Sequence, residues 1–185
     1  MTAKSSQKAL AIEATPPSLR LEMALDTVYK ENIMIIFNSN AKPVYVFNED
    51  ALYRLGSNKV NLSSVSNDNQ LLAINQLPLQ DGLTIPLKVG SNAYSTYTLN
   101  LKDIQGVPQV YDIWLKDALT GDSVSMRTNP SYTFSITPDT VSYGAHRFTL
   151  VVRQNPALAY HLLNFTATKA TGKQVQVNCT TENEG

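Results

Sequence analysis

Cysteine is nearly absent from this chain. Cys179 is the single cysteine among 185 residues, so neither an internal disulfide nor a cysteine-based metal cluster can hold the fold together. Histidine is almost as rare, since only His146 and His161 occur, and neither lies in a recognisable catalytic or metal-binding motif. We therefore expect stability to come from an apolar core, and the two histidines to be ordinary strand or linker residues.

Neither sign of charge is in excess, because 15 Lys and Arg balance 15 Asp and Glu. This balance argues against nucleic acid or an anionic membrane as a partner. Long hydrophobic runs are also missing: the longest, Ile33–Phe37, is far shorter than the roughly 20 apolar residues that cross a bilayer, so we expect no membrane insertion. Met1–Thr15 lacks the charged start and long apolar block of a signal peptide. If the protein is exported, its signal is expected to lie outside these residues.

Alternating apolar residues run along most of the chain from Ser18 onward. Leu19, Leu21 and Met23 alternate with charged neighbours, which is the period of a half-buried strand. The same alternation recurs at 33–37, 72–74, 85–89, 97–101, 111–115, 132–136 and 148–152. Turn-forming residues separate these segments. The pattern predicts roughly ten short strands in an all-β fold, an antiparallel β-sandwich of jelly-roll-like type.

Three regions follow from this pattern. Residues 1–17 are expected to be a flexible segment, residues 18–153 the sandwich, and residues 154–185 a linker followed by one hairpin. This hairpin either joins the preceding sandwich or begins a separate module. Only Glu49–Leu55 is expected to form a helical turn, because Asn48 can cap it and Gly56 can end it. The expected core residues are Leu21, Met23, Ile35, Phe37, Ile74, Leu87, Leu99, Ile113, Tyr132, Phe134, Phe148 and Leu150.

Several motifs resemble a β-sandwich module of large secreted and cell-surface proteins of the Bacteroidota, of the type exported by type IX secretion. The most specific element leads from Trp114–Asp117 through a Thr120–Gly121 turn to Asn129–Pro130, Tyr132–Phe134 and Arg147–Phe148. The tail "LLNFTATKATGKQVQVNCTTENEG" resembles the first hairpin of a fibronectin type III-like repeat, with Cys179 where such repeats usually have Trp. The resemblance implies a secreted or cell-surface location and adjacent modules as partners. It implies no catalytic residues.

Carboxylates are the remaining candidates for catalysis or for metal binding. A glycosidase would need two of them across the scissile bond, and the nearest pairs are Glu49–Asp50 and Asp112 with Asp117. Asp112 and Asp117 have opposite parity on one strand, so their side chains are expected on opposite faces. Calcium is a second possibility at Asn67–Asn69 and Asn48–Asp50, which supply clustered oxygens. The same residue types are also standard in turns and caps, so no cofactor is expected.

Exposed aromatic residues would be needed for carbohydrate binding. Trp114 shares its strand face with Asp112, while its neighbours form the apolar face, so Trp114 is a candidate platform residue. Tyr94, Tyr143 and Tyr160 lie in loop-like sequence and are further candidates. Strand aromatics more often pack against neighbouring strands, which leaves both interpretations open.

Three tripeptides match the Asp-Ser/Thr-apolar pattern of O-glycosylation in exported Bacteroidota proteins, with Thr27, Ser123 and Thr140 as the acceptors. A glycan at these positions would require a surface loop. Taken together, the sequence predicts a non-catalytic structural or adhesive module. The alternative is a carbohydrate-binding module, whose partner would be a cell-surface glycan.

Overall fold

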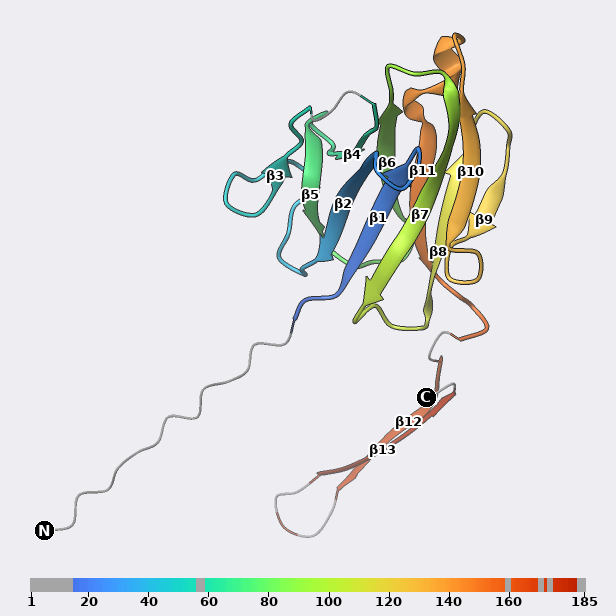
Figure 1. The fold of residues 1–185 in the computed structure, drawn as a ribbon. Helices are drawn as coiled ribbons and strands as arrows, with labels where there is room; N and C mark the ends of the chain where they lie inside the picture. Colours follow the sequence, from blue (N-terminus) through green and yellow to red (C-terminus); the bar gives the residue numbers. More distant parts are fainter. Residues whose placement is uncertain (1–14, 56–58, 159–160, 170–171, 173–174, 183–185) are drawn as a thin grey trace, which may run out of the picture.

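The computed structural model describes residues 15–55, 59–158, 161–169, 172 and 175–182 (Figure 1). The strands are β1 (Ser18–Ala24), β2 (Lys30–Phe37), β3 (Ala51–Leu52), β4 (Asn61–Val65), β5 (Leu71–Leu77), β6 (Leu83–Gly90), β7 (Ser95–Gln105), β8 (Tyr111–Asp117), β9 (Ser123–Ser125), β10 (Ser131–Ile136), β11 (Gly144–Gln154), β12 (His161–Lys169) and β13 (Val175–Glu182). One 3-10 turn, η1 (Thr140–Ser142), is the only helical element among the described residues. The predicted all-β sandwich-like fold is confirmed.

Eleven strands form one strongly curved, nearly closed sheet that folds over on itself. Their order is β10-β7-β1-β2-β5-β4-β6-β11-β8-β9, and β3 pairs with β5 beside this path. The recorded strand pairs are antiparallel except β2 with β5, which run parallel. Strands β10 and β9 are the two ends of the series. Because the sheet folds over, both ends come to the same side of the sandwich (Figure 1).

The core lies between the two layers that this folding produces. Strand β6 shows how the sequence builds it, because Leu83, Ile85, Leu87 and Val89 are buried while the residues between them are not. A period of two places these four side chains on one face of the strand. Similar stripes from β1, β2, β7, β8, β10 and β11 join them in a single apolar cluster.

Ten of the twelve expected core residues are buried, and Ile74 and Tyr132 are only partly buried. At Ile74 the alternation breaks, because the buried residues of β5 are Leu72, then Asn75 and Leu77. Ile74 pairs instead with Ala51 of the short strand β3, across a register shift. A bulge of this kind changes which side chains face the core, so the simple period-two prediction was wrong at this position.

The predicted helical turn at Glu49–Leu55 is also wrong. Ala51 and Leu52 form β3, and Asp50 ties the preceding turn to the sheet by accepting hydrogen bonds from the backbone amides of Val46 and Gln76, both at 2.8 Å. An Asp that bonds backbone amides in this way competes with helix formation. The observed helical turn η1 is capped instead by Asp139, whose side chain accepts from the amide of Val141.

The predicted hairpin is present as β12 and β13, which pair with each other in a separate two-stranded sheet. At the other end of the chain, the carbonyl of Pro17 accepts a hydrogen bond from the amide of Phe37 at 2.7 Å. The backbone is therefore tied to the sandwich at Pro17, the last residue of the segment expected to be flexible. Residues 1–14 of that segment lie outside the described residues. Among the described residues, no helix is long and apolar enough to cross a membrane.

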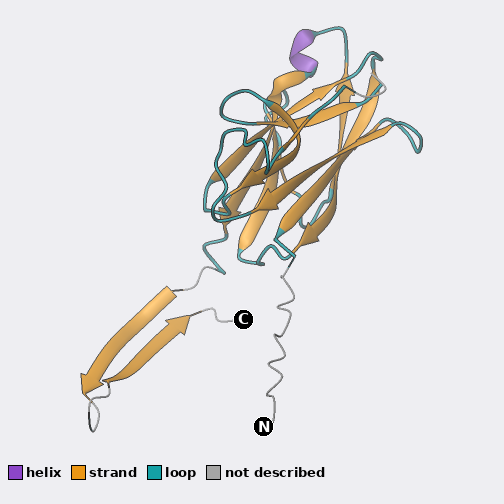
Figure 2. Ribbon diagram, turned by 90° about the vertical axis from the view of Figure 1, so that its left-hand side faces the viewer, coloured by secondary structure: helices purple, strands orange, loops and turns teal. Residues whose placement is uncertain are grey.

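The chain enters and leaves the sandwich at the same end. Ser18 pairs with Gln105, the last residue of β7, and the amide of Asn155 bonds the nearby carbonyl of Val110. Ile136 pairs with Ser95 at the opposite end of β7 and leads directly into η1. Figure 2 shows η1 at the end of the sandwich that is farthest from the point where the chain enters and leaves.

Candidate functional site

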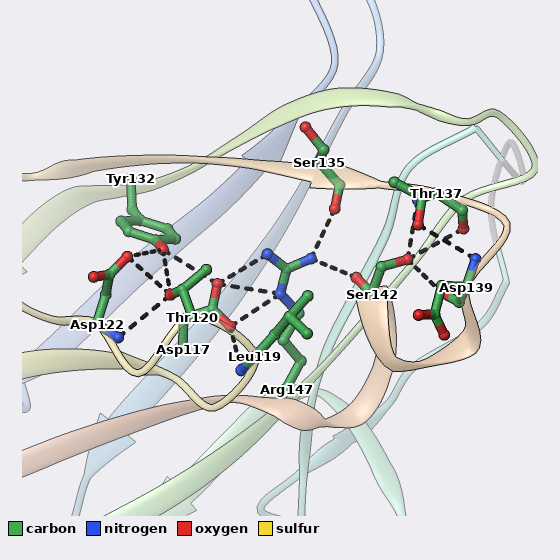
Figure 3. A network of polar contacts seen from close by, with 10 residues as sticks. All are labelled: Asp117, Leu119, Thr120, Asp122, Tyr132, Ser135, Thr137, Asp139, Ser142 and Arg147. Atoms are coloured by element: carbon green, nitrogen blue, oxygen red, sulfur yellow. Dashed lines mark hydrogen bonds and ion pairs between the residues drawn. The ribbon is translucent and has the colours of Figure 1, made fainter.

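The most distinctive polar feature of the sandwich is a buried ion pair between Asp117, the last residue of β8, and Arg147 of β11 (Figure 3). Their side chains are 1% and 3% exposed. Arg147 Nη2 donates to Asp117 Oδ2 at 2.9 Å, and Nε donates to Oδ1 at 3.0 Å. This two-point geometry is the strong form of the arginine–carboxylate contact.

Backbone carbonyls and aromatic rings complete the environment of Arg147. Its Nη1 donates to the carbonyl oxygens of Ser135 at 2.7 Å and of Ser142 at 2.6 Å. The guanidinium carbon lies 5.0 Å from the ring centre of Phe134 and 4.8 Å from that of Phe148, which is close enough for cation–π attraction. A buried cation is tolerated when it is paired and hydrogen-bonded, and Arg147 meets both conditions.

A second layer of hydrogen bonds extends the network toward the surface. The hydroxyl of Tyr132 donates to Asp122 Oδ2 at 2.8 Å and lies 3.2 Å from Asp117 Oδ2. Thr120 Oγ1 donates to the same Asp122 oxygen at 2.8 Å. The network therefore joins the turn after β8 to strand β10, and through Arg147 it joins both to β11 and η1 (Figure 3).

The pKa values of two groups in this network, Asp117 and Tyr132, are shifted away from neutral pH. Burial alone would raise the pKa of Asp117, but hydrogen bonds from Arg147 and from the Leu119 amide outweigh it and hold that pKa below its ordinary value. Burial, together with the carboxylates of Asp122 and Asp117, raises the pKa of Tyr132 to about 12. A general acid or base works best with a pKa near the operating pH. Neither shift brings the pKa of Asp117 or of Tyr132 toward neutral pH.

The network closes what we call the seam, the gap between edge strand β10 and the Ala118–Asp122 turn that follows β8. Strand β10 pairs with β7 on one side only, and an unpaired edge exposes backbone groups that invite aggregation. Arg147 donates a hydrogen bond to one such group, the carbonyl of Ser135. The hydroxyl of Tyr132, also on β10, donates to Asp122 in the turn. Side-chain hydrogen bonds therefore hold this edge of β10, which pairs with no strand among the described residues.

The predicted ligand-binding aromatics that the structure describes, Trp114, Tyr94 and Tyr143, lie in different places. Trp114 is half-buried on β8, with the guanidinium of Arg153 5.1 Å from its ring centre, and its indole Nε1 is buried without a hydrogen-bond partner among the described residues. It is therefore not a free platform. Tyr94 is 65% exposed in the turn between β6 and β7, and Tyr143 is 37% exposed after η1. Tyr160 lies outside the described residues.

The carboxylates considered for calcium or catalysis hold local structure. Asp68 Oδ1 accepts hydrogen bonds from the Tyr45 amide at 3.0 Å and from the Ser66 hydroxyl at 2.6 Å, and Asp50 is used as described above. Asp112 and Asp117 differ in burial, in agreement with the opposite faces expected for them. Within the described part of the chain, no group of three or more His, Cys, Asp or Glu residues is placed to hold a metal ion.

The predicted glycosylation acceptors are all exposed: Thr27 in the β1–β2 turn, Ser123 at the start of β9 and Thr140 in η1. The two Asp-Thr-Val copies share a local geometry. In Asp26–Val28 and in Asp139–Val141, Asp Oδ1 accepts from the amide of the Val, at 2.8 and 3.2 Å. This Asx turn leaves the central threonine on the surface.

Two surface hollows, each of about 430 Å³, lie beside the seam. Leu119, Val141 and Arg147 line both of them, Tyr143 and His146 line the first, and hydroxyl and carboxylate side chains dominate the second. Turn-forming residues occur at Thr120–Asp122 and at Thr137–Thr140, but nothing in the local sequence predicts that these two turns meet. The side chain of His161 lies outside the described residues.

Comparisons with known proteins find no matching family model, no matching curated protein and no matching solved structure.

Proposed function

We propose that this chain is a non-catalytic structural or adhesive module of a secreted or cell-surface protein, with adjacent modules of the same protein as its partners. The buried Asp117–Arg147 pair is the observation that carries the proposal. The charged groups of Asp117 and Arg147 are buried and bonded to each other, and Arg147 also bonds to β10, so this pair joins β8, β10 and β11. Such a module holds its shape and separates or presents its neighbours.

The hairpin supports the modular part of this proposal. Val175, Val177 and Cys179 alternate along β13 with Gln176 and Asn178, and these side chains are exposed. A hairpin that is half apolar and pairs only with itself is marginal in water. We infer that β12 and β13 belong to a second unit, the fibronectin type III-like repeat expected from the sequence.

Surface exposure on living cells tests the location. Antibodies raised against the Ser18–Gln154 sandwich should label intact cells of the producing organism, and brief protease treatment of those cells should remove the signal. Labelling that appears only after lysis, with a cytoplasmic protein as the control, would contradict an extracellular location.

A carbohydrate-binding role is the second candidate. One observation favours it: Tyr143 is exposed and lines a hollow at the end of the sandwich opposite the chain entry. The other two predicted aromatics do not line that hollow, and Arg153 covers the ring of Trp114.

A further inference from the structure

We propose that the seam, with the two hollows beside it, is a binding site for a neutral carbohydrate chain. This inference rests on the carbohydrate-binding role given above as the second candidate function. It moves the site from Trp114, the best candidate in the sequence, to the turn after β8 and the η1 segment.

The two hollows form one continuous surface. Leu119, Val141 and Arg147 line both, so the first hollow adjoins the second. Each hollow, at about 430 Å³, falls within the range of small-molecule sites, roughly 300 to 1,000 Å³. A chain of two or more sugar rings could therefore contact both hollows across Leu119 and Val141.

The polar side chains suit a ligand rich in hydroxyl groups. Asp122 and Asp139 contribute carboxylates to the second hollow, and Thr133 contributes a hydroxyl. Asp122 Oδ2 is used by Tyr132 and Thr120, and Asp139 Oδ1 by the Val141 amide. The other oxygen of each carboxylate has no hydrogen bond to any described residue, so it can accept one from a sugar hydroxyl.

The apolar side chains suit the C–H faces of sugar rings. Leu119, Val141 and Tyr143 are 46%, 55% and 37% exposed, and all three line the first hollow. An exposed aromatic ring next to polar groups is the usual arrangement for recognising an amphipathic ligand. Adjacent exposed apolar side chains with a polar rim mark interaction surfaces more often than scattered ones do.

The charges favour a neutral ligand. The only guanidinium that lines the hollows belongs to Arg147, and Asp117 already neutralises it. Two carboxylates remain at the surface, so an anionic polysaccharide would be repelled. A cationic peptide would also be attracted by them, but it would not present the C–H ring faces that suit the exposed side chains of Leu119, Val141 and Tyr143, and we therefore favour a sugar.

The site is also rigid and accessible. The Asp117–Arg147 network fixes the turn, β10 and η1 relative to one another (Figure 3), and a preformed site loses less entropy on binding. It lies at the end of the sandwich away from the chain entry and exit (Figure 2), so neighbouring modules attached there would not cover it.

Amide NMR titration of the unmodified full chain tests the proposal. The probes are maltohexaose, cellohexaose, xylohexaose, mannohexaose and, separately, octalysine. We expect at least one hexasaccharide to shift the amides of residues 118–122 and 133–143. Tyr143→Ala and Asp139→Asn should each weaken that binding about tenfold or more, since hydrogen bonds to charged groups and buried aromatic contacts have that size. Asparagine keeps the cap of η1 through its amide oxygen, while the other carboxylate oxygen, the proposed acceptor for the sugar hydroxyl, becomes an amide nitrogen that donates and carries no charge.

Tyr94→Ala is the control, because it removes an even more exposed tyrosine ring from a different turn, and it should change affinity less than twofold. Shifts centred on Trp114 or Tyr94 would overturn the seam site while leaving carbohydrate binding in place. No shift with any hexasaccharide would overturn both. Shifts at the seam with octalysine alone would identify a cationic protein partner and refute the carbohydrate assignment.

Discussion

Arg147→Met is the substitution that most severely tests the role of the buried network. Methionine keeps an unbranched apolar stem between Phe134 and Phe148, so the change removes the charge and the hydrogen bonds with little loss of packing. Asp117 is then a carboxylate with a 1% exposed side chain and no cation. Breaking one partner of a buried pair costs about 3 to 5 kcal/mol, and the carbonyls of Ser135 and Ser142 also lose their donor.

Urea denaturation followed by circular dichroism measures this loss as a change in the free energy of unfolding. The double variant Asp117→Asn/Arg147→Met removes the unpaired charge, so its loss should be smaller than the sum of the two single losses by about 2 kcal/mol or more. Lys102→Met provides a matched control. Lys102 Nζ lies 3.8 Å from Glu22 Oε1, and the two side chains are 45% and 11% exposed, so breaking this longer, single-contact and partly solvated pair should cost less than Arg147→Met does.

If Arg147→Met lowers the free energy of unfolding by less than about 1 kcal/mol, the Asp117–Arg147 pair contributes no more than an ordinary surface pair, and that result would refute this reasoning. Additivity in the double variant would do the same, because independent sites add and coupled ones do not.

Three further predictions follow. The pKa of Asp117 is lowered in the folded protein, so the unfolded chain binds more protons in acid and stability should fall as pH drops below about 4. The pKa of Tyr132 is raised in the folded protein, so stability should also fall as pH rises from about 10 toward 12. Tyr132→Phe should remove that alkaline loss in denaturation curves. Phe148→Ala, at a fully buried position, should cost about 3 to 5 kcal/mol of unfolding free energy, and an unchanged thermal melt would contradict its place in the core. Peptide mass spectrometry of the protein purified from its own organism should find glycans on Thr27, Ser123 and Thr140, each removed by substitution with Ala; unmodified peptides at all three would disprove that assignment.

Period-two alternation predicted most of the sheet, because most strands have one face in the core. It failed where that condition fails. Strand β4 reads Asn-Leu-Ser-Ser-Val, and its three central residues, Leu62, Ser63 and Ser64, are buried in succession. Ser64 is tolerated there because its hydroxyl donates to the carbonyl of Leu72 at 3.2 Å. Such a segment has no alternating signal and reads as loop.

The alternation of the sequence predicts that Asp117 is buried, but it does not predict that Arg147 is. Asp117 shares the parity of Ile113 and Leu115, so the alternation places a carboxylate toward the core, where it needs a partner. Arg147 precedes Phe148 and by strict alternation would face solvent. A register shift between Gly144 and Phe148 interrupts the pairing of β11 with β6, and Arg147 is buried beside Phe148. Bulges re-aim side chains in this way, and local sequence gave no sign of it.

Hydrogen exchange of strand β10 is the most direct measurement of whether side chains close the seam. In the wild-type protein, the β10 amides that bond to β7 should be protected as strongly as those of β1. The Arg147→Met variant is measured without denaturant, at a pH where it stays folded. Its β10 amides should exchange faster than in the wild type, while the exchange rates of the β1 and β2 amides should be unchanged. Equal protection of β10 in both proteins would show that the strand is held without Arg147, and the structural role assigned to the buried pair would be wrong.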